Sequence, residues 1–102
     1  NVSGENSKSG VAPADLPALA VAVAALPSAR VQLRGLMSIP EPAADEQAQR
    51  LPHRLLRGLL ADLRARGLAL DTLSMGMSAD LEAAVTEGST LVRVGSAIFG
   101  SR

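Results

Sequence analysis

Two long stretches of the chain carry hydrophobic residues at the spacing of an amphipathic helix. The first is predicted to be capped by Asp15 and stops at Pro27, with apolar residues every three or four positions, which places them on one helix face. The second covers residues 45–66 and ends before Gly67, a residue suited to cap a helix. Pro52 either kinks this second helix or marks the point where its regular part begins. The apolar positions are Leu16, Leu19, Val23 and Leu26 in the first stretch, and Leu51, Leu55, Leu56, Leu59, Leu60 and Leu63 in the second.

Short runs of aliphatic and β-branched residues between these helices predict strands. The runs cover residues 31–39, 71–77 and 90–94, and residues 1–10 predict the end of another strand that leads into a loop. Gly35, inside the first run, marks close packing or a bend. A third helix is predicted between the second and third runs, capped by Ser78 and ended by Gly88.

This succession of strands and helices predicts an α/β fold built from parallel βαβ units with right-handed crossovers. Three strands and a strand end do not cover both faces of a parallel sheet, and the sequence ends with no covering helix beyond Arg102. We therefore expect residues 1–102 to form one domain that is part of a larger fold. The chain begins at Asn1 without the charged and apolar regions of a signal peptide, which also favours a fragment.

Composition narrows the possible classes of function. Ten basic residues balance ten acidic ones, so the net charge gives no general attraction to nucleic acid or to an anionic membrane. No apolar run reaches the roughly 20 residues that a membrane span needs. The lack of cysteine excludes disulfides, thiolate nucleophiles and Cys-based metal sites, and it suits a cytoplasmic protein. We accordingly expect a small-molecule ligand, with neither nucleic acid nor membrane as a partner.

Polar and glycine residues follow each predicted strand, where parallel α/β folds build their sites. Ser38 follows the first strand, residues 75–78 follow the second, and Gly95 and Ser96 follow the third. The Ser78 hydroxyl, the free N–H groups of a helix start and the backbone after the third strand could together hold a phosphate. The alternative is structural, with Ser78 an ordinary helix cap and Gly95 an ordinary turn residue.

Arg93 lies between two valines in a predicted strand, so its guanidinium enters an apolar setting and needs an acceptor there. Three acceptors fit this pattern: solvent beside an edge strand, an internal carboxylate such as Asp71, or an atom of a bound ligand. The residues alone leave these alternatives open.

Other charged residues have simpler interpretations. Lys8 is the only lysine, and in a polar loop we expect it in solvent. His53 is the only histidine, has no partner at metal-ligand spacing and is expected at the surface. Arginines on the second helix predict a solvated face rather than a nucleic-acid stripe, because no aromatic residues are interleaved with them. They are Arg50, Arg54, Arg57 and Arg64.

Four segments together resemble the pyridoxal phosphate homeostasis protein family, which is related to the N-terminal barrel of alanine racemase. They are NVSGENSKSG (1–10), LRGLMSIP (33–40), DTLSMGMSAD (71–80) and EGSTLVRVGSAIFGSR (87–102). The resemblance implies a (βα)8 barrel of the TIM type. Because such barrels are about twice as long as this chain, it further implies the C-terminal half only, from the end of strand five through strand eight.

A half barrel of this kind has consequences for partners. It leaves two strand edges unpaired and an apolar interior face open to water. We therefore expect the chain to pair with the missing N-terminal half of the barrel or with a second copy of itself.

The resemblance also implies a cofactor, pyridoxal 5′-phosphate, and the residues that hold it. Ser78, Gly95 and Ser96 would hold the phosphate, Arg93 would meet the pyridine nitrogen, and Met75, Gly76 and Met77 would line the pocket. The lysine that forms the family's Schiff base lies on the first strand of the barrel, in the half expected to be absent. Lys8 does not correspond to that lysine.

The pairing of Arg93 with the ring nitrogen would restrict the chemistry. A guanidinium cannot accept a proton, so it keeps the nitrogen unprotonated and weakens the ring as an electron sink. The resemblance thus implies a protein that binds and delivers pyridoxal phosphate without catalytic turnover. The alternative is half of a fold-type III enzyme barrel, an amino-acid racemase or decarboxylase, because alanine racemases share this arrangement. They also need an acid/base residue from a second domain.

Overall fold

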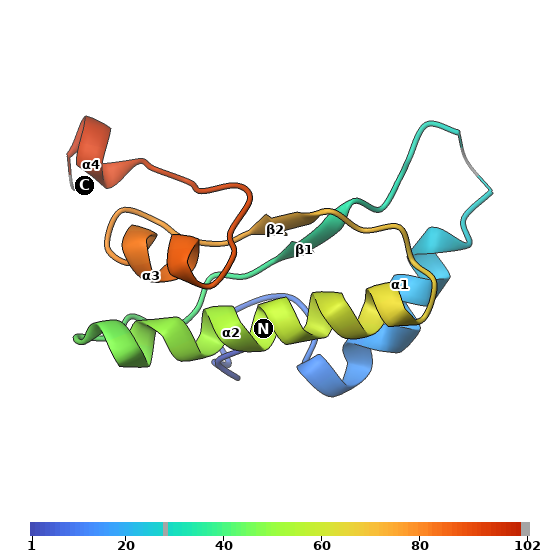
Figure 1. Cartoon of the computed structure of the whole chain (residues 1–102), viewed down its shortest axis with the longest axis horizontal. Helices are drawn as coiled ribbons and strands as arrows, with labels where there is room; N and C mark the ends of the chain where they lie inside the picture. The colour runs from blue at the N-terminus through green and yellow to red at the C-terminus, as the bar shows by residue number, and fades with distance from the viewer. Residues whose placement is uncertain (28, 101–102) are drawn as a thin grey trace.

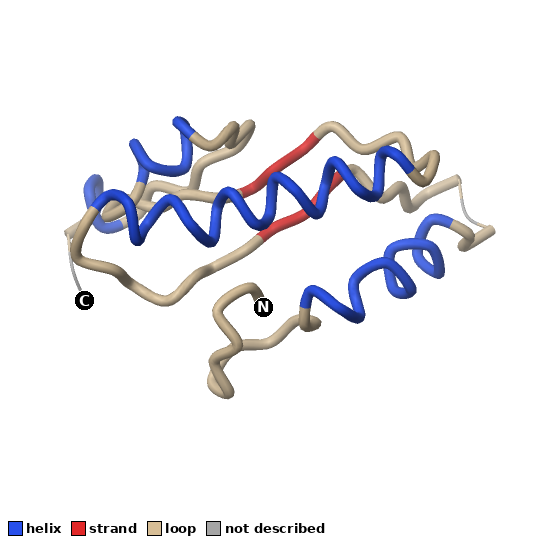
Figure 2. The backbone as a smooth tube through the Cα atoms, turned by 60° about the horizontal axis from the view of Figure 1, so that its bottom comes forward, coloured by secondary structure: helices blue, strands red, loops and turns tan. Residues whose placement is uncertain are grey.

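The computed structural model of the chain describes residues 1–27 and 29–100. The elements in chain order are a 3-10 helix, η1 (Pro13–Asp15), then α1 (Leu16–Ala24), β1 (Gly35–Met37), α2 (Glu46–Ala65), β2 (Thr72–Ser74), α3 (Leu81–Thr86) and α4 (Ser96–Phe99). Figure 1 shows their arrangement, and Figure 2 colours the same backbone by secondary structure. Residues 101–102, which end the last of the four family-like segments, lie outside the described residues.

β1 and β2 form a two-stranded parallel sheet joined by α2, which confirms the predicted α/β class. Gly35 pairs with Thr72 at one end of the register, and Met37 pairs with Ser74 at the other. A Cβ atom added at Gly35 would stand 1.8 Å from the carbonyl oxygen of Thr72. The close packing predicted at Gly35 is therefore confirmed, because only a residue without a side chain fits there.

The third predicted strand, residues 90–94, is reduced to an isolated parallel bridge between Leu91 and Ser74. A side chain replaces part of the ladder, since the hydroxyl of Thr90 accepts the amide hydrogen of Leu73 at 2.8 Å. The segment consequently runs beside the end of β2 without extending the sheet.

The strand end predicted at residues 1–10 is wrong, because this segment forms turns. The backbone amide of Lys8 and the side-chain amide of Asn1 each donate to the carbonyl of Glu5, both at 3.1 Å. Small polar residues and glycine favour such local hydrogen bonds over pairing with a strand.

The second predicted helix is confirmed as α2, which continues through Pro52. Asp45 caps it, since its carboxylate accepts the amide hydrogen of Ala48 at 2.8 Å. The regular part of the helix thus begins before the proline. At the other end, the amide of Gly67 donates to the carbonyl of Arg64 at 3.0 Å and closes the last turn.

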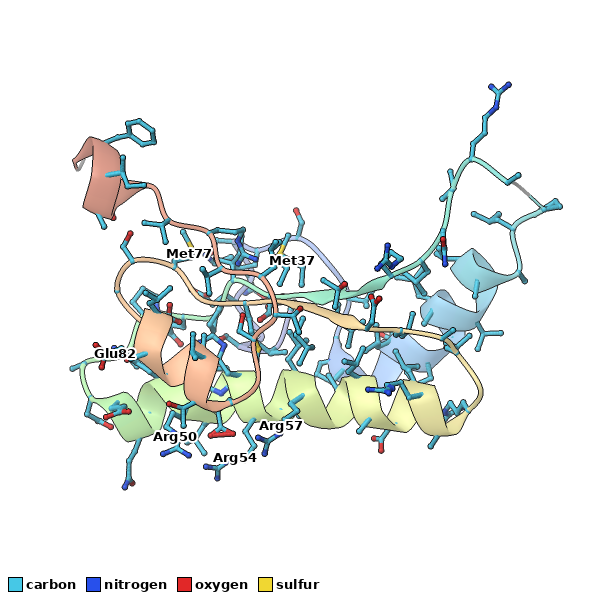
Figure 3. All side chains as sticks on the ribbon, turned by 45° about the horizontal axis from the view of Figure 1, so that its top comes forward. Met37, Arg50, Arg54, Arg57, Met77 and Glu82 are labelled. Atoms are coloured by element: carbon cyan, nitrogen blue, oxygen red, sulfur yellow. The ribbon has the colours of Figure 1, made fainter. Side chains whose placement is uncertain are left out.

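α2 lies along one face of the sheet, and the opposite face is not covered by any helix in the described residues (Figures 1 and 2). Met37 and Met77 lie on that opposite side (Figure 3). The predicted leucine face is split, because Leu51 and Leu55 remain exposed. The buried core cluster comprises Ala20, Leu56, Leu60, Leu63, Leu70, Leu73, Met75 and Ala84.

None of the helices within residues 1–27 and 29–100 is long and apolar enough to cross a membrane.

The caps of α1 and α3 differ from the prediction. The side chain of Asp15 makes no capping hydrogen bond at the start of α1. α3 begins with Asp80 at its N-cap position, so the prediction that Ser78 caps this helix is wrong. Asp80 takes that position because the chain first closes a turn that contains Ser78.

Three arginines of α2 surround one buried carboxylate. Glu87 follows the end of α3, and only 2% of its side-chain surface is exposed. Its carboxylate oxygens lie 2.8 Å from Nε of Arg50, 3.3 Å from Nε of Arg54 and 3.2 Å from Nη1 of Arg57. Figure 3 shows the three arginines in a row along α2. The prediction that these arginines only form a solvated face is therefore wrong for all three, because they attach α3 to α2 through Glu87.

Acid should loosen this contact between α3 and α2. Hydrogen bonds from Arg54 and Arg50 lower the pKa of Glu87 from 4.5 to about 2. Because the folded state has the lower pKa, the contact stabilises the fold fully above pH 4.5 and is lost as the pH falls toward 2. Denaturation midpoints over this range should fall more steeply for the wild type than for Glu87→Gln. Parallel curves would contradict the expectation, and Glu82→Gln, exposed on α3, is the control.

Candidate functional site

A cavity of about 410 Å³ lies where the loops after β1 and β2 meet the start of α4. We call it the strand-end cavity. It combines apolar surface with hydroxyl groups and open backbone. Its lining residues are Lys8, Ile39, Pro40, Glu41, Pro42, Ala43, Gln49, Met77, Ser78, Ala79, Asp80, Gly95 and Ser96.

A tight turn at residues 77–80 forms one wall of the strand-end cavity. The amide of Asp80 donates to the carbonyl of Met77 at 3.2 Å, and the amide of Met77 donates to the Asp80 carboxylate at 2.8 Å. Ser78 is one of the two central residues of this turn. Its hydroxyl accepts the amide hydrogen of Ala97 at 3.1 Å, so it faces the start of α4.

Gly95 and Ser96 line the same cavity. Gly95 directly precedes α4, and Ser96 is the first residue of this helix. No heavy atom lies within 4 Å of the place where a Cβ of Gly95 would stand, which leaves the backbone there open. The structure therefore brings Ser78, Gly95 and Ser96 to one place, as the order of strand ends predicts.

Arg93 spans the ends of both strands and is half-buried. Its Nη1 donates to the carbonyl of Ser74 at 2.8 Å and to the hydroxyl of the same residue, while Nη2 donates to the carbonyl of Ser38 at 2.7 Å. Asp71 is not its partner, because that carboxylate pairs with Arg34 at 2.7 Å. Hydrogen bonding from Arg34 also lowers the pKa of Asp71 below its usual value. The guanidinium of Arg93 is thus fixed at the carboxyl ends of the strands, but Arg93 is not among the residues that line the strand-end cavity.

Met75 and Gly76 do not line the strand-end cavity. Met75 is fully buried in the core. Gly76 has a φ of +102°, and a Cβ atom there would stand 2.6 Å from Cβ of Ala84. Of residues 75–77, which the resemblance places around a cofactor, only Met77 borders this cavity.

Comparison with known proteins identifies the family. The family described as "Alanine racemase, N-terminal domain" matches residues 2–102. The chain belongs to this family. Two curated relatives named pyridoxal phosphate homeostasis protein match all 102 residues, with 64% identity in Pseudomonas aeruginosa and 52% in Escherichia coli. The chain spans less than half the length of these relatives, 42% and 43%.

Solved structures also resemble this alanine racemase N-terminal domain. PipY of Synechococcus elongatus, solved with PLP bound, matches with a TM-score of 0.79 and 36% identity, over 97% of this chain and 47% of PipY. A structure described as an unknown protein from Bifidobacterium adolescentis matches with a TM-score of 0.85 and 42% identity, over 95% of this chain and 39% of that protein.

These matches correct one part of the prediction from sequence. The matched family is the N-terminal domain of alanine racemase, a TIM-barrel-type α/β fold, and the assignment to a C-terminal half is not borne out. Every βα unit of such a barrel has the same architecture, so the order of strands and helices in this chain does not fix its position in the barrel. A missing N-terminal half or a second copy as partner likewise gains no support.

Two residues of this alanine racemase N-terminal domain were missed as parts of the site. His53 is fully buried, so its predicted surface position is wrong. Its Nε2 lies 2.8 Å from Oδ2 of Asp80, in the turn at residues 77–80. A helical spacing signal was available, because His53 lies three residues before Leu56, on the buried face of α2.

Lys8 also differs from its predicted position in solvent. Its side chain is half-buried, lines the strand-end cavity and places Nζ 4.0 Å from the carboxylate of Glu5. The turn in residues 1–10 brings it there.

Within the described residues, no group of three or more His, Cys, Asp or Glu residues could hold a metal ion.

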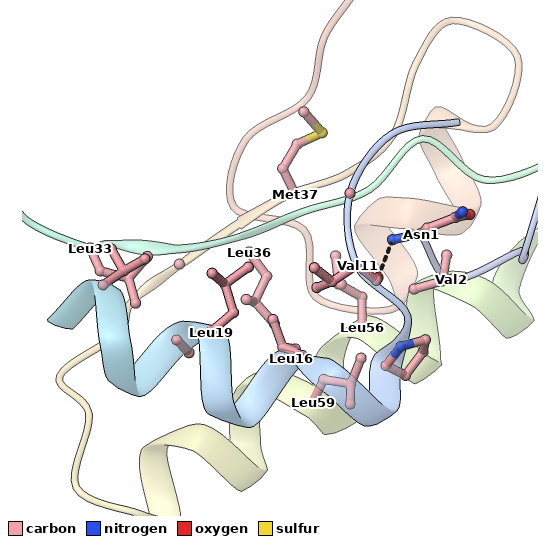
Figure 4. Close-up of a pocket in the computed structure, with 15 residues that line it drawn as sticks. Asn1, Val2, Val11, Leu16, Leu19, Leu33, Leu36, Met37, Leu56 and Leu59 are labelled. Atoms are coloured by element: carbon pink, nitrogen blue, oxygen red, sulfur yellow. Dashed lines mark hydrogen bonds between the residues drawn. The ribbon is translucent and has the colours of Figure 1, made fainter. Parts of the chain in front are cut away.

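A second cavity, of about 250 Å³, lies between the N-terminal segment, α1, β1 and α2 (Figure 4). Leu16, Leu36 and Leu56 lie on its walls, and no ionisable side chain does. The nitrogen of Asn1 donates to the carbonyl of Val11 at 2.9 Å at its edge. Aliphatic side chains dominate this lining, and no serine hydroxyl lies in it, which distinguishes this cavity from the strand-end cavity.

Proposed function

We propose that this chain binds pyridoxal 5′-phosphate at the strand-end cavity, as part of a protein that binds and delivers the cofactor. The observation that carries the proposal is the meeting of Ser78, Gly95 and Ser96 around one cavity. The names of the two curated relatives, and the PLP bound to PipY, support it.

The polar groups of the cavity fit a phosphate. Phosphate oxygens accept hydrogen bonds, and the hydroxyls of Ser78 and Ser96 and the open backbone at Gly95 can supply donors. The Ser78 oxygen accepts the Ala97 amide hydrogen at 3.1 Å, which leaves the hydroxyl hydrogen of Ser78 to donate to a phosphate oxygen. We therefore assign the phosphate to these groups.

We assign Arg93 to the pyridine nitrogen. Its guanidinium carries donors only, and the carbonyls of Ser38 and Ser74 hold it at the strand ends. A donor at this position favours the unprotonated nitrogen, which disfavours carbanion chemistry on the ring. Met77 would cover the ring from the cavity wall, while Met75 and Gly76 would support that wall from behind.

The proposed role is not catalytic. Pyridoxal phosphate supplies an aldehyde that reacts with amines when it is bound. In this chain the cavity residues bind and orient it, and the donor-only Arg93 works against turnover. The name shared by the curated relatives describes homeostasis, which supports binding and delivery over a racemase or decarboxylase.

Removing the two cavity hydroxyls should weaken cofactor binding. Each lost hydrogen bond to the charged phosphate costs about 1.5–3 kcal/mol, so Ser78→Ala with Ser96→Ala should raise the Kd for pyridoxal phosphate by about a hundredfold or more. A titration followed by absorbance in the intact protein measures this. Ser9→Ala, exposed and outside the cavity, is the control and should bind normally. An unchanged Kd in the double variant would sink the phosphate assignment.

A further inference from the structure

Asp80 occupies the N-cap position of α3 without capping the helix. An N-cap aspartate normally accepts an amide hydrogen from the first turn, but this side chain makes no such bond. Its Oδ1 accepts the amide hydrogen of Met77 at 2.8 Å, and its Oδ2 lies 2.8 Å from Nε2 of His53. The carboxylate therefore serves the turn before the helix and a side chain from α2.

Burying His53 at its position costs more free energy than burying a leucine there would. The Asp80 carboxyl is an acceptor for the Met77 amide, and we assign it the same role here, with Nε2 of His53 as the donor. The ring is fully buried, and Nδ1 has no hydrogen-bond partner in the described part of the chain. Burying an unpaired polar atom costs free energy, whereas an aliphatic residue beside Leu56 would not carry that cost. The bond to Asp80 is what the histidine contributes.

The same helix holds the turn at a second point. Gln49 lies one helical turn before His53, and its Nε2 donates to the carbonyl of Ala79 at 3.5 Å and to that of Ala43 at 3.0 Å. The turn at residues 77–80 is thus attached through Ala79 and Asp80 to a helix of 20 residues. Two attachments to one long helix restrict how the turn can move.

We propose that His53 is a positioning residue for the phosphate site. Acting through Asp80, it holds the turn at residues 77–80 so that the Ser78 hydroxyl meets the start of α4. His53 does not line the strand-end cavity, so it acts on a ligand only through the turn. This inference rests on the function proposed for that cavity.

Three variants of the intact protein test the proposal. His53→Leu removes the hydrogen-bond donor and puts an aliphatic side chain in its place. His53→Gln keeps a donor near the position of Nε2. Leu60→Val disturbs the buried face of α2 away from the turn. Calorimetry measures the Kd for pyridoxal phosphate and for inorganic phosphate. Amide hydrogen exchange, followed by NMR, reports whether the Met77 amide stays protected.

His53→Leu should raise the Kd for both ligands by about tenfold, the effect of losing one hydrogen bond to a charged group. Its Met77 amide should exchange faster, His53→Gln should restore most of the affinity, and Leu60→Val should bind normally. Normal binding by His53→Leu would overturn this inference and leave the proposed function standing. An equal loss in Leu60→Val would reveal a general stability effect and also overturn it. A wild type that binds neither ligand would overturn the proposed function itself.

Discussion

Replacing Gly35 with alanine should destabilise the fold by at least about 3 kcal/mol, because its added methyl group meets the shortest contact found at any of the glycines. The new Cβ would stand 1.8 Å from the carbonyl oxygen of Thr72, inside the paired strand. That oxygen belongs to the backbone and cannot rotate away as a side chain would. Relief requires separating β1 from β2, which removes the only ladder between the strands of this sheet in the described residues.

A urea unfolding curve measures the loss. Gly58→Ala is the matched control, because Gly58 lies exposed in the middle of α2 with no heavy atom within 4 Å of its added Cβ. Alanine there should stabilise the protein by about 0.5–1 kcal/mol through helix propensity. If the Gly35→Ala variant unfolded at the wild-type denaturant concentration, the parallel register at this position would be incorrect.

Gly76→Ala should cost about 2–4 kcal/mol and also weaken ligand binding at the strand-end cavity. Two effects add at this position. A φ of +102° is strained for alanine, and the added methyl group would stand 2.6 Å from Cβ of Ala84 in α3. Because Gly76 directly precedes the turn at residues 77–80, the displacement needed to relieve the contact moves Ser78.

Gly67→Ala separates the two effects. Gly67 has a nearly equal φ of +97°, but no heavy atom lies within 4 Å of its added Cβ. Its substitution should cost only the backbone strain, about 1–2 kcal/mol, and leave ligand binding unchanged. Equal losses of stability in Gly76→Ala and Gly67→Ala, measured by thermal unfolding, would show that the contact with Ala84 is not a tight one.

Helices were the part of the fold that could be predicted best from sequence. The predicted second helix, residues 45–66, differs from α2 by one residue at each end, because a capping aspartate and a terminal glycine act locally. Strands were predicted too long. The run at residues 31–39 is a strand only at Gly35–Met37, since a strand is defined by the partner it pairs with and that partner is distant in the chain.

The candidate site was predictable where it follows from the order of strand ends. The convergence of Ser78 with Gly95 required only that parallel strands end on the same side. The bond between His53 and Asp80 joins residues 27 positions apart, and the contact between Arg50 and Glu87 joins residues 37 apart. A local pattern cannot reveal such pairs, although the position of His53 on the leucine face indicated burial.

α4 is the least buried helix around the strand-end cavity, with Phe99 84% exposed and Ile98 68% exposed. Few apolar contacts oppose its detachment, so its local opening free energy is expected to lie well below that of the core. Ser96 nevertheless belongs to the cavity wall. By thermodynamic linkage, a ligand that binds only the closed form raises the cost of opening by about 1.4 kcal/mol for every tenfold excess over its Kd. Occupancy of the cavity and docking of this short helix would then be two measures of a single equilibrium.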